Sequence, residues 1–269
     1  MEMNNFKIRF SRFILVFICS LFFCANSIFS QNSGKLLYEK RKNVLKANIT
    51  SLAFNNYQFQ AERVISKEIS LGFSFSRVNK ANIPFVEDTF YILLSTDFID
   101  TNEILYNMMT SASVSGISII PEIRIYLGNG FGKGFYLAPF HKYSNFDLDM
   151  VQITEFEREN GSFENIETNG DFSTNSFGLL FGTQFNLGQR FVLDCYLGPH
   201  FGNHRGELTG RFNEALSLNE QVELDKEFGD FILPLNSDTT VIIGNEILKV
   251  DTSGQWIGLR LGINLGYRF

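Results

Sequence analysis

Six charged residues stand at alternate positions of amphipathic segments, an arrangement that turns all six toward one enclosed space. Three are basic and three are acidic: Lys46, Arg124, Arg260, Glu62, Glu122 and Asp194. An unpaired charge in a confined interior is costly, so equal numbers of each sign predict a network of salt bridges that plugs the space. The same residues could instead line a path for cations or protons, or form a gate from one switchable pair.

A histidine on the same segment as Asp194 raises a hydrolase hypothesis. His200 follows Asp194, and a carboxylate that orients a histidine can activate a serine hydroxyl. Six residues of extended chain separate two side chains by about 20 Å, however, so these two cannot touch. His200 and His204 could bind a metal together with loop acids, but no HExxH or comparable spacing accompanies them. We therefore expect no catalytic residue, cofactor or metal.

The segments that carry these residues alternate between apolar and polar positions. The clearest is 257–269, where every second residue is apolar: Ile257, Leu259, Leu261, Ile263, Leu265, Tyr267 and Phe269. Strict alternation over this length predicts one β-strand with a single apolar face. The segment is longer than most strands of soluble proteins and suits a tilted strand that crosses a bilayer.

Seven further segments follow the same rule, which gives eight predicted strands. They span residues 43–52, 56–63, 68–76, 116–128, 134–144, 176–188 and 191–202. Long polar connections are expected at 79–112, 146–172 and 204–253, and they alternate with short turns at 66–68, 128–133 and 188–190. Outer-membrane barrels have short periplasmic turns and long external loops. The first hairpin, at 54–56, is then an unusually short external loop.

These features predict an all-β fold, an eight-stranded antiparallel up-and-down transmembrane β-barrel. Every backbone amide in hydrocarbon must be paired, so amphipathic strands close on themselves with their apolar faces toward lipid. The interior of so small a barrel has room only for side chains, which favours a plug over an ion path. The alternative is a secreted soluble β-sandwich, whose core could also absorb the 30 phenylalanines.

One external loop is expected to contain a short helix, within residues 213–234. Ser217 is suited to cap it, and Glu220 three residues later completes a capping box. Leu216, Leu224 and Phe228 are expected to pack on the base of the loop. The helix either orders the loop or, alternatively, serves as a regulatory or partner-binding element.

Residues 1–31 have the layout of a cleaved signal peptide, which leaves 32–269 as the barrel domain. Three basic residues precede an apolar run at 13–24 that is too short to span a bilayer as a helix. A lipoprotein would need a small residue before its acceptor cysteine, but Phe23 precedes Cys24 and Ile18 precedes Cys19. Cleavage removes three of the 23 basic and one of the 29 acidic residues, leaving a net charge of −8. This charge argues against nucleic-acid binding.

Three stretches resemble an uncharacterised family of outer-membrane β-barrels from Bacteroidota: residues 43–75, 121–144 and 258–269. The resemblance covers most of the chain after the signal peptide and implies the barrel fold and the outer membrane, but no activity. The terminal alternation also resembles the C-terminal signal by which outer-membrane barrels are recognised for assembly, which would rest on Tyr267 and Phe269.

The sequence therefore predicts a small non-enzymatic barrel of the cell outer membrane. Its expected partners are outer-membrane lipid, lipopolysaccharide, ligands or proteins at its loops, and the barrel-assembly machinery during biogenesis. One alternative is a narrow conduit for small or hydrophobic molecules, with an open lumen or a lateral gap near Pro121 or Pro199. The other is a lipid-modifying enzyme with a polar triad near the outer leaflet.

Overall fold

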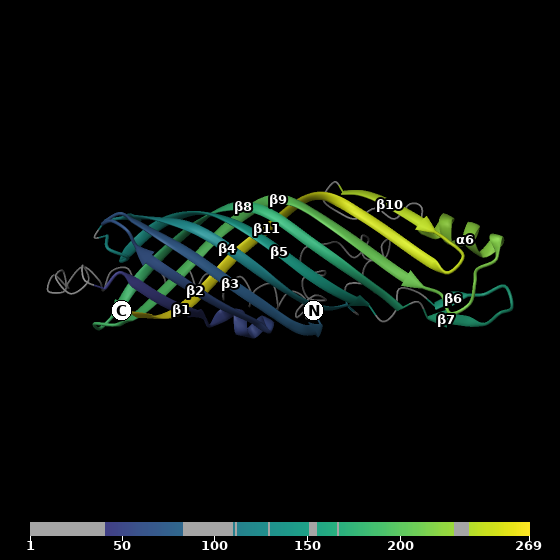
Figure 1. The fold of residues 1–269 in the computed structure, drawn as a ribbon, viewed down its shortest axis with the longest axis horizontal. Coiled ribbons are helices and arrows are strands. Elements are labelled where there is room, and N and C mark those ends of the chain that lie inside the picture. The colour runs from purple at the N-terminus through teal and green to yellow at the C-terminus, as the bar shows by residue number, and fades with distance from the viewer. Residues whose placement is uncertain are drawn as a thin grey trace, which may run out of the picture.

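The protein is a barrel of antiparallel strands, as a computed structural model shows (Figure 1). The structure describes residues 41–82, 110, 112–128, 130–150, 155–165, 167–228 and 237–269. The predicted signal peptide and residues 83–109 of the first long connection lie outside these ranges. Eight strands form the ring: β1 (Asn43–Asn48), β2 (Asn56–Val64), β3 (Ile69–Asn82), β4 (Ser113–Leu127), β5 (Gly134–Met150), β8 (Glu167–Leu187), β9 (Phe191–Arg211) and β11 (Ile247–Arg268). The predicted fold class is confirmed.

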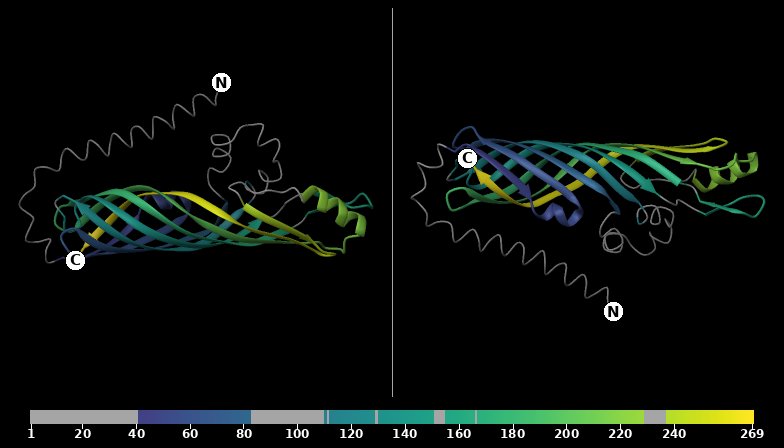
Figure 2. Two further views of the ribbon diagram at one scale, coloured as in Figure 1. Left: turned by 90° about the horizontal axis from the view of Figure 1, so that it is seen from above. Right: turned by 60° about the horizontal axis from the view of Figure 1, so that its bottom comes forward.

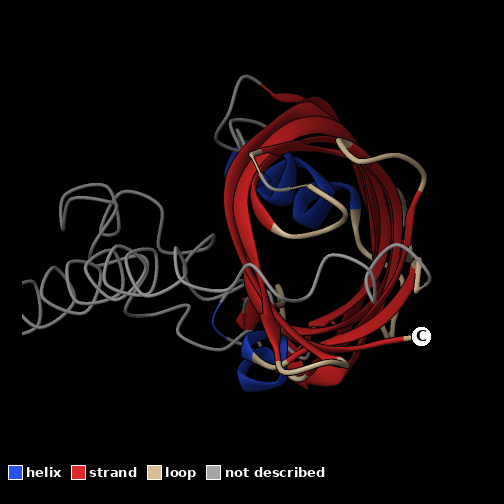
Figure 3. Cartoon of the chain, turned by 90° about the vertical axis from the view of Figure 1, so that its left-hand side faces the viewer, coloured by secondary structure: helices blue, strands red, loops and turns tan. Residues whose placement is uncertain are grey.

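The ring is closed by the pairing of the first strand with the last. Five residues of β1, from Val44 to Asn48, pair antiparallel with β11, and Figure 3 shows the strands as a continuous ring in end view. Following successive cross-strand partners from Ala47 through every strand leads to Gln255 on β11. Ala47 itself pairs with Leu265, ten residues away from Gln255. Such a stagger accompanies tilted strands and an interior that side chains fill.

The strands extend far beyond the length that a bilayer needs. β8 and β9 have 21 residues each and β11 has 22, whereas about 9–11 residues of a tilted strand cross a membrane. On β9 the outward positions are apolar up to Phe201, which is 57% exposed, and then turn polar at Asn203, Arg205 and Glu207. We call the polar-faced part, residues 145–150, 167–175, 203–211 and 237–255, the extension.

The extension corrects the prediction of long loops at 146–172 and 204–253. Much of this sequence continues the barrel strands or adds β10 (Ser237–Ile243), which pairs with β11. A small hairpin of β6 (Glu155–Glu157) and β7 (Phe163–Asn165) and the helix α6 (Leu218–Phe228) complete this end. Figure 2 shows α6 at the end of the molecule opposite the C-terminus in both views.

The first predicted strand is shorter than expected. β1 ends at Asn48, and residues Thr50–Phe54 form a 3-10 helix, η1, before β2 begins. Asn48 explains the change, because its Oδ1 accepts hydrogen bonds from the Thr50 hydroxyl at 2.7 Å and from the Ser51 amide at 2.9 Å. These bonds turn the chain within a segment whose alternation had predicted a continued strand.

The edge of β11 that faces β1 changes partner along its length. Residues 248–254 of β11 pair with β10 and residues 264–268 pair with β1. Between them, the part of the chain that the structure describes supplies no partner strand to this edge. Pro121 and Pro199 pair on one side with Phe73 and Leu259, whereas on the other side the β4–β5 and β8–β9 pairings skip the two prolines. Among the described residues, no helix has both the length and the apolar character to cross a membrane.

Helix α6 closes the extension as its sequence predicts. The Glu220 amide donates to the Ser217 hydroxyl at 3.2 Å, and the Ser217 amide donates to Glu220 Oε2 at 2.8 Å, which is the predicted capping box. Leu216 and Leu224 are buried against apolar residues of the strands, among them Leu208 and Leu248. The side chain of Phe228 lies outside the described residues.

We expect replacement of Glu220 with alanine to lower the local stability of α6 by about 0.5–2 kcal/mol, the usual range for a lost cap. The Ser217 amide, together with the Glu159 amide and the Arg158 guanidinium, lowers the pKa of the Glu220 carboxyl despite its burial. The stabilisation is therefore fully present above the ordinary glutamate pKa and is lost as the pH falls through the lower folded value. Amide hydrogen exchange of 218–226 across this pH range measures the effect. Glu223 is exposed, so Glu223→Ala is the control. An equal loss of local stability in this variant would contradict the role of the capping box.

Candidate functional site

The six predicted interior charges lie together in the half of the barrel nearest the short turns, inside the membrane-facing belt. Their side chains are fully buried, except for Arg260, whose side chain is 6% exposed. They come from five different strands, and the alternation of each strand turns them inward while apolar neighbours face outward. We call these six residues the charged plug: Lys46, Glu62, Glu122, Arg124, Asp194 and Arg260.

Arg124 is the centre of the charged plug. Its Nε donates to Glu122 Oε1 at 2.6 Å, and its NH1 lies 2.9 Å from Asp194 Oδ2 and 3.4 Å from Glu62 Oε2. The guanidinium also stacks over the Tyr136 ring, with Cζ 4.4 Å from the ring centroid. One planar group thus contacts all three carboxylates, which a lysine ammonium could not do with the same geometry.

The two other cations neutralise the flanks of the plug. Lys46 Nζ lies 2.5 Å from Glu62 Oε2 and 2.9 Å from Asp194 Oδ2. Arg260 NH1 donates to Glu122 Oε2 at 2.7 Å. Each carboxylate therefore meets two cations, and the three charges of each sign balance. Such a cluster avoids the cost of isolated buried charges, because its members are both paired and hydrogen-bonded.

Neutral side chains complete the plug, and the sequence did not single them out. Gln60 and Gln184 donate or accept within it, and two tyrosine hydroxyls donate to carboxylates: Tyr126 to Glu62 and Tyr136 to Asp194, both at 2.7 Å. Three of them, Gln60, Gln184 and Tyr126, lie on strand faces that the sequence predicts to point inward, beside the charged residues. This position was the available sign that they contact the charges. Tyr136 belongs to the least regular predicted strand.

The short-turn end of the barrel is closed by a turn that folds across it. The turn between β4 and β5 is held by Arg268, whose guanidinium donates to the carbonyls of Phe131 at 2.9 Å and Gly132 at 2.7 Å. Gln184 donates to the same Gly132 carbonyl at 2.7 Å. The plug is therefore fastened directly to this turn.

Between the plug and the extension the interior becomes aromatic and then apolar. Arg260 stacks on Phe140 and Tyr196, and His204 and Trp256 both pack on Phe172. The apolar cluster beneath α6 follows. Inside the extension the pattern is thus the reverse of that in the belt, with polar residues outside and apolar residues inside.

Of the residues of the hydrolase hypothesis, His200 meets a serine but Asp194 lies apart from both. Asp194 is held by Lys46, Arg124 and Tyr136, while His200 Nδ1 lies 3.0 Å from the Ser176 hydroxyl. His204 Nδ1 lies 3.1 Å from the Gln255 carbonyl. Among the described residues, no three histidine, cysteine or carboxylate groups form a metal site. Tyr267 on β11 and Phe269, which follows the end of this strand, are 37% and 51% exposed.

An apolar belt outside a ring of eight strands, with polar groups buried inside, defines the class of protein: a transmembrane β-barrel. No family model and no curated protein matches the chain. Among solved structures it is similar to a major outer membrane protein from Thermus thermophilus, at 11% identity over 85% of this chain and 98% of that one, with a TM-score of 0.38.

Two other solved structures are also similar to the chain. Acinetobacter baumannii CarO is 10% identical over 79% of this chain and 97% of that chain, with a TM-score of 0.32. The N-terminal β-barrel domain of Pseudomonas aeruginosa OprF is 8% identical over 85% of this chain and 97% of that domain, with a TM-score of 0.24. Likeness at this level says nothing about activity, so the function must be inferred from the strand ring and its interior.

Proposed function

We propose that the protein is a non-conducting anchor in the cell outer membrane that presents the extension to the outside. The charged plug carries this proposal. It fills the narrowest kind of barrel with balanced, fully paired charges, and the turn held by Arg268 lies across one end. A water-filled path would require water to displace these direct bonds between the carboxylates and the cations of the plug.

The extension supplies the surface for contacts outside the membrane. Its outward face has a row of four acidic residues that are directly opposite one another on neighbouring strands: Asp147, Asp171, Glu207 and Asp251. Lys249, which lies beside this row, is 3.2 Å from Glu207 and 3.4 Å from Asp251. The rigid sheet would hold this acidic face beyond the headgroups, where lipopolysaccharide, ligands or partner proteins are reached. We propose binding rather than catalysis, because Asp194 and His200 act in separate clusters.

Cysteine labelling of whole cells tests the anchor and its orientation. In a Cys195→Ser background, a membrane-impermeant maleimide is expected to label Ser173→Cys in the extension on intact cells. The matched control, Lys67→Cys in a short turn at the opposite end, is expected to react only after the outer membrane is opened. Labelling of the turn but not of the extension on intact cells would show that the protein has the opposite orientation. Recovery of the protein in the soluble fraction would refute the membrane location.

One observation favours a second candidate, a lateral route for hydrophobic molecules. The edge of β11 between its β10-paired part and Ile263, residues 255–262, has no partner strand in the part of the chain that the structure describes, whereas Ile263 bonds to Ile49 and Thr50. The gap lies away from Pro121, but Pro199 is the cross-strand partner of Leu259, in the middle of this edge. A disulfide between η1 and this edge, placed at two positions whose Cα atoms lie about 4.4–6.8 Å apart, would abolish uptake if the route operates. It would leave the anchor function unchanged.

A further inference from the structure

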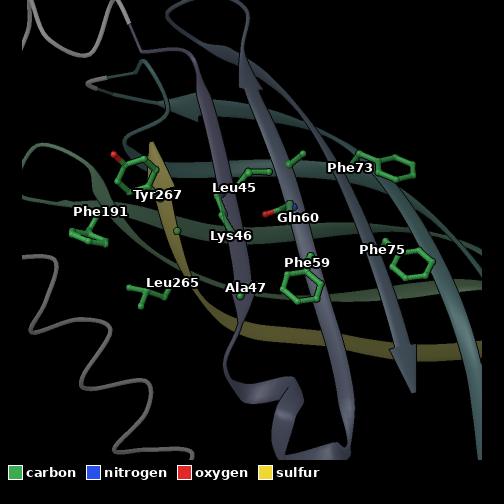
Figure 4. A pocket seen from close by; sticks show the side chains of 12 residues that line it. Leu45, Lys46, Ala47, Phe59, Gln60, Phe73, Phe75, Phe191, Leu265 and Tyr267 are labelled. Carbon is green, nitrogen blue, oxygen red and sulfur yellow. The ribbon is translucent and has the colours of Figure 1, made fainter. Parts of the chain in front are cut away.

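A groove of about 520 Å³ lies on the outside of the barrel, across the seam where β1 closes on β11 (Figure 4). Two small residues on neighbouring strands, Ala47 and Ala61, form its floor. Phe73 and Tyr267 stand at either end of one row of cross-strand partners, and Phe59 is directly opposite Ala47. The groove is therefore a local consequence of sequence, because two methyl side chains interrupt a belt of large apolar ones.

The groove has the composition of a site for hydrocarbon. Phe59 is 60% exposed and Phe73 is 51% exposed, and both belong to the outward faces that form the apolar belt. Exposed aromatic walls beside a floor of alanine favour a flexible chain that fills the hollow. In a bilayer, the chain at this position is the acyl chain of a lipid.

Basic side chains stand where the groove reaches the short-turn end of the barrel. Arg190 donates a hydrogen bond to the Tyr267 hydroxyl, and its Cζ lies 5.8 Å from the Tyr267 ring centroid. Arg63 lies two residues beyond Ala61 on the same outward face of β2 and donates to Asn43 Oδ1 at 2.9 Å. Arg41 donates to the Gln189 carbonyl at 3.1 Å.

These hydrogen bonds all go to neutral atoms, so the guanidinium charges of Arg41, Arg63 and Arg190 are not compensated by them. Two lysines, Lys42 and Lys67, add to the same end. Among the described residues, the acidic groups at this end are the Glu68 side chain and the Phe269 carboxylate, whose oxygen accepts from the Asn43 amide at 3.1 Å, and the five basic side chains outnumber them. An anionic group placed beside Arg190 and Arg63 would therefore meet a strongly positive rim, to which guanidinium groups can donate pairs of hydrogen bonds.

We propose that this seam is a binding site for an anionic phospholipid. One acyl chain occupies the groove over Ala47 and Ala61, and the phosphate lies between Arg190 and Arg63. The inference rests on the proposed membrane location and deepens it, since it names the lipid class and its place. The lipid would cover the shortest strand of the barrel at the point where the ring closes, and would thereby support the seam.

Lipid retention in nanodiscs tests the proposal. The full-length mature protein is reconstituted in an equimolar mixture of phosphatidylglycerol and phosphatidylcholine with identical chains, then transferred to native mass spectrometry. We expect wild-type protein to retain one phosphatidylglycerol, at least about fivefold over phosphatidylcholine, a ratio that corresponds to about 1 kcal/mol. Millimolar inorganic phosphate should not displace it, because free phosphate lacks the chain.

Three variants separate the two halves of the site. Arg190→Gln, alone or with Arg63→Gln, should abolish the preference for the anionic headgroup while some lipid is still retained. Ala61→Phe, which fills the groove, should abolish retention of both lipids, and Ala61→Leu provides the same test if the larger residue prevents folding. Lys133→Gln, a basic turn residue that does not line the groove, should leave retention unchanged.

Retention of both lipids in equal amounts, a preference unchanged in Arg190→Gln with Arg63→Gln, or displacement by inorganic phosphate would each overturn the proposal. Failure of the wild-type protein to insert into any bilayer would instead contradict the proposed membrane function. Heat-modifiable migration on a gel distinguishes that case, since a folded barrel and an unfolded chain migrate differently.

Discussion

Replacement of Arg124 with methionine is expected to lower the free energy of unfolding by about 3–5 kcal/mol, the range seen when one partner of a buried ion pair is removed. The change would leave Glu62, Glu122 and Asp194 with only Lys46 and Arg260 for compensation, and it would also remove the stacking on Tyr136. Urea unfolding of protein refolded in lipid vesicles measures the loss. Trp256, the chain's single tryptophan, packs on Phe172 of the extension and is a suitable fluorescent reporter.

Two controls give this prediction its discriminating power. Lys249→Met removes an exposed cation that contacts two carboxylates, and such surface pairs contribute only about 0–1 kcal/mol. Arg124→Lys keeps the charge but cannot reach all three carboxylates, so its loss should lie between those of the other two variants. If Arg124→Met cost no more than Lys249→Met, the charged plug would not be a stabilising unit.

The second large effect is expected at an inward glycine, Gly182 on β8. A methyl group at this position would lie 2.8 Å from Cε1 of Tyr136 and closer still to the hydroxyl end of the ring. Tyr136 cannot move aside freely, because its hydroxyl donates to Asp194 and its ring lies under Arg124. Gly182→Ala is therefore expected to cost about 1–3 kcal/mol through overpacking, measured by the same unfolding assay.

A second substitution identifies the cause of that loss. Tyr136→Leu removes the hydroxyl and the outer part of the ring, so Gly182→Ala in this background should cost little. The coupling energy of the double-mutant cycle should then approach the whole cost of the single Gly182 change. Equal costs in both backgrounds would show that the glycine matters for another reason, such as strand pairing.

The sequence predicted the charged interior because alternation is a local property. Once apolar and polar residues alternate along a strand, the side chain of Glu62 or Arg124 must share a face with the small and polar residues of that strand. Closing the ring then turns all of these faces toward one narrow axis, so the charges are brought together whatever their exact register. Their separate distances depend on the stagger of the ring, which no single segment encodes.

The sequence failed where polar residues occupy both faces of a strand. Asn203, Arg205 and Glu207 point outward from β9, but they alternate with Gly202, His204 and Gly206, so the apolar signal disappears at the membrane boundary. The segment was therefore predicted to be a loop, although β8 and β11 pair with it on both sides. Long-range pairing holds these strands, and a pattern read within one segment cannot detect that.

The neutral members of the plug were missed for a related reason. A buried carboxylate needs donors on all sides, and Tyr126, Tyr136 and Gln60 supply them from three strands. Only a known register shows which donor meets which carboxylate.

The predicted end of the first strand, at residue 52, was wrong for a local reason. The Asn48 side chain forms hydrogen bonds that compete with strand pairing, so β1 ends at Asn48.

The most direct test of the account is the ionic conductance of the purified, refolded protein in a planar lipid bilayer. The charged plug and the turn across one end predict no discrete conductance steps from the wild-type protein in concentrated salt, even after insertion has been verified by heat-modifiable migration. A variant that removes the central cation, Arg124→Ala, is expected to produce brief openings if it folds. Stable, ion-selective conductance from the wild-type protein would contradict the central claim that the lumen is closed.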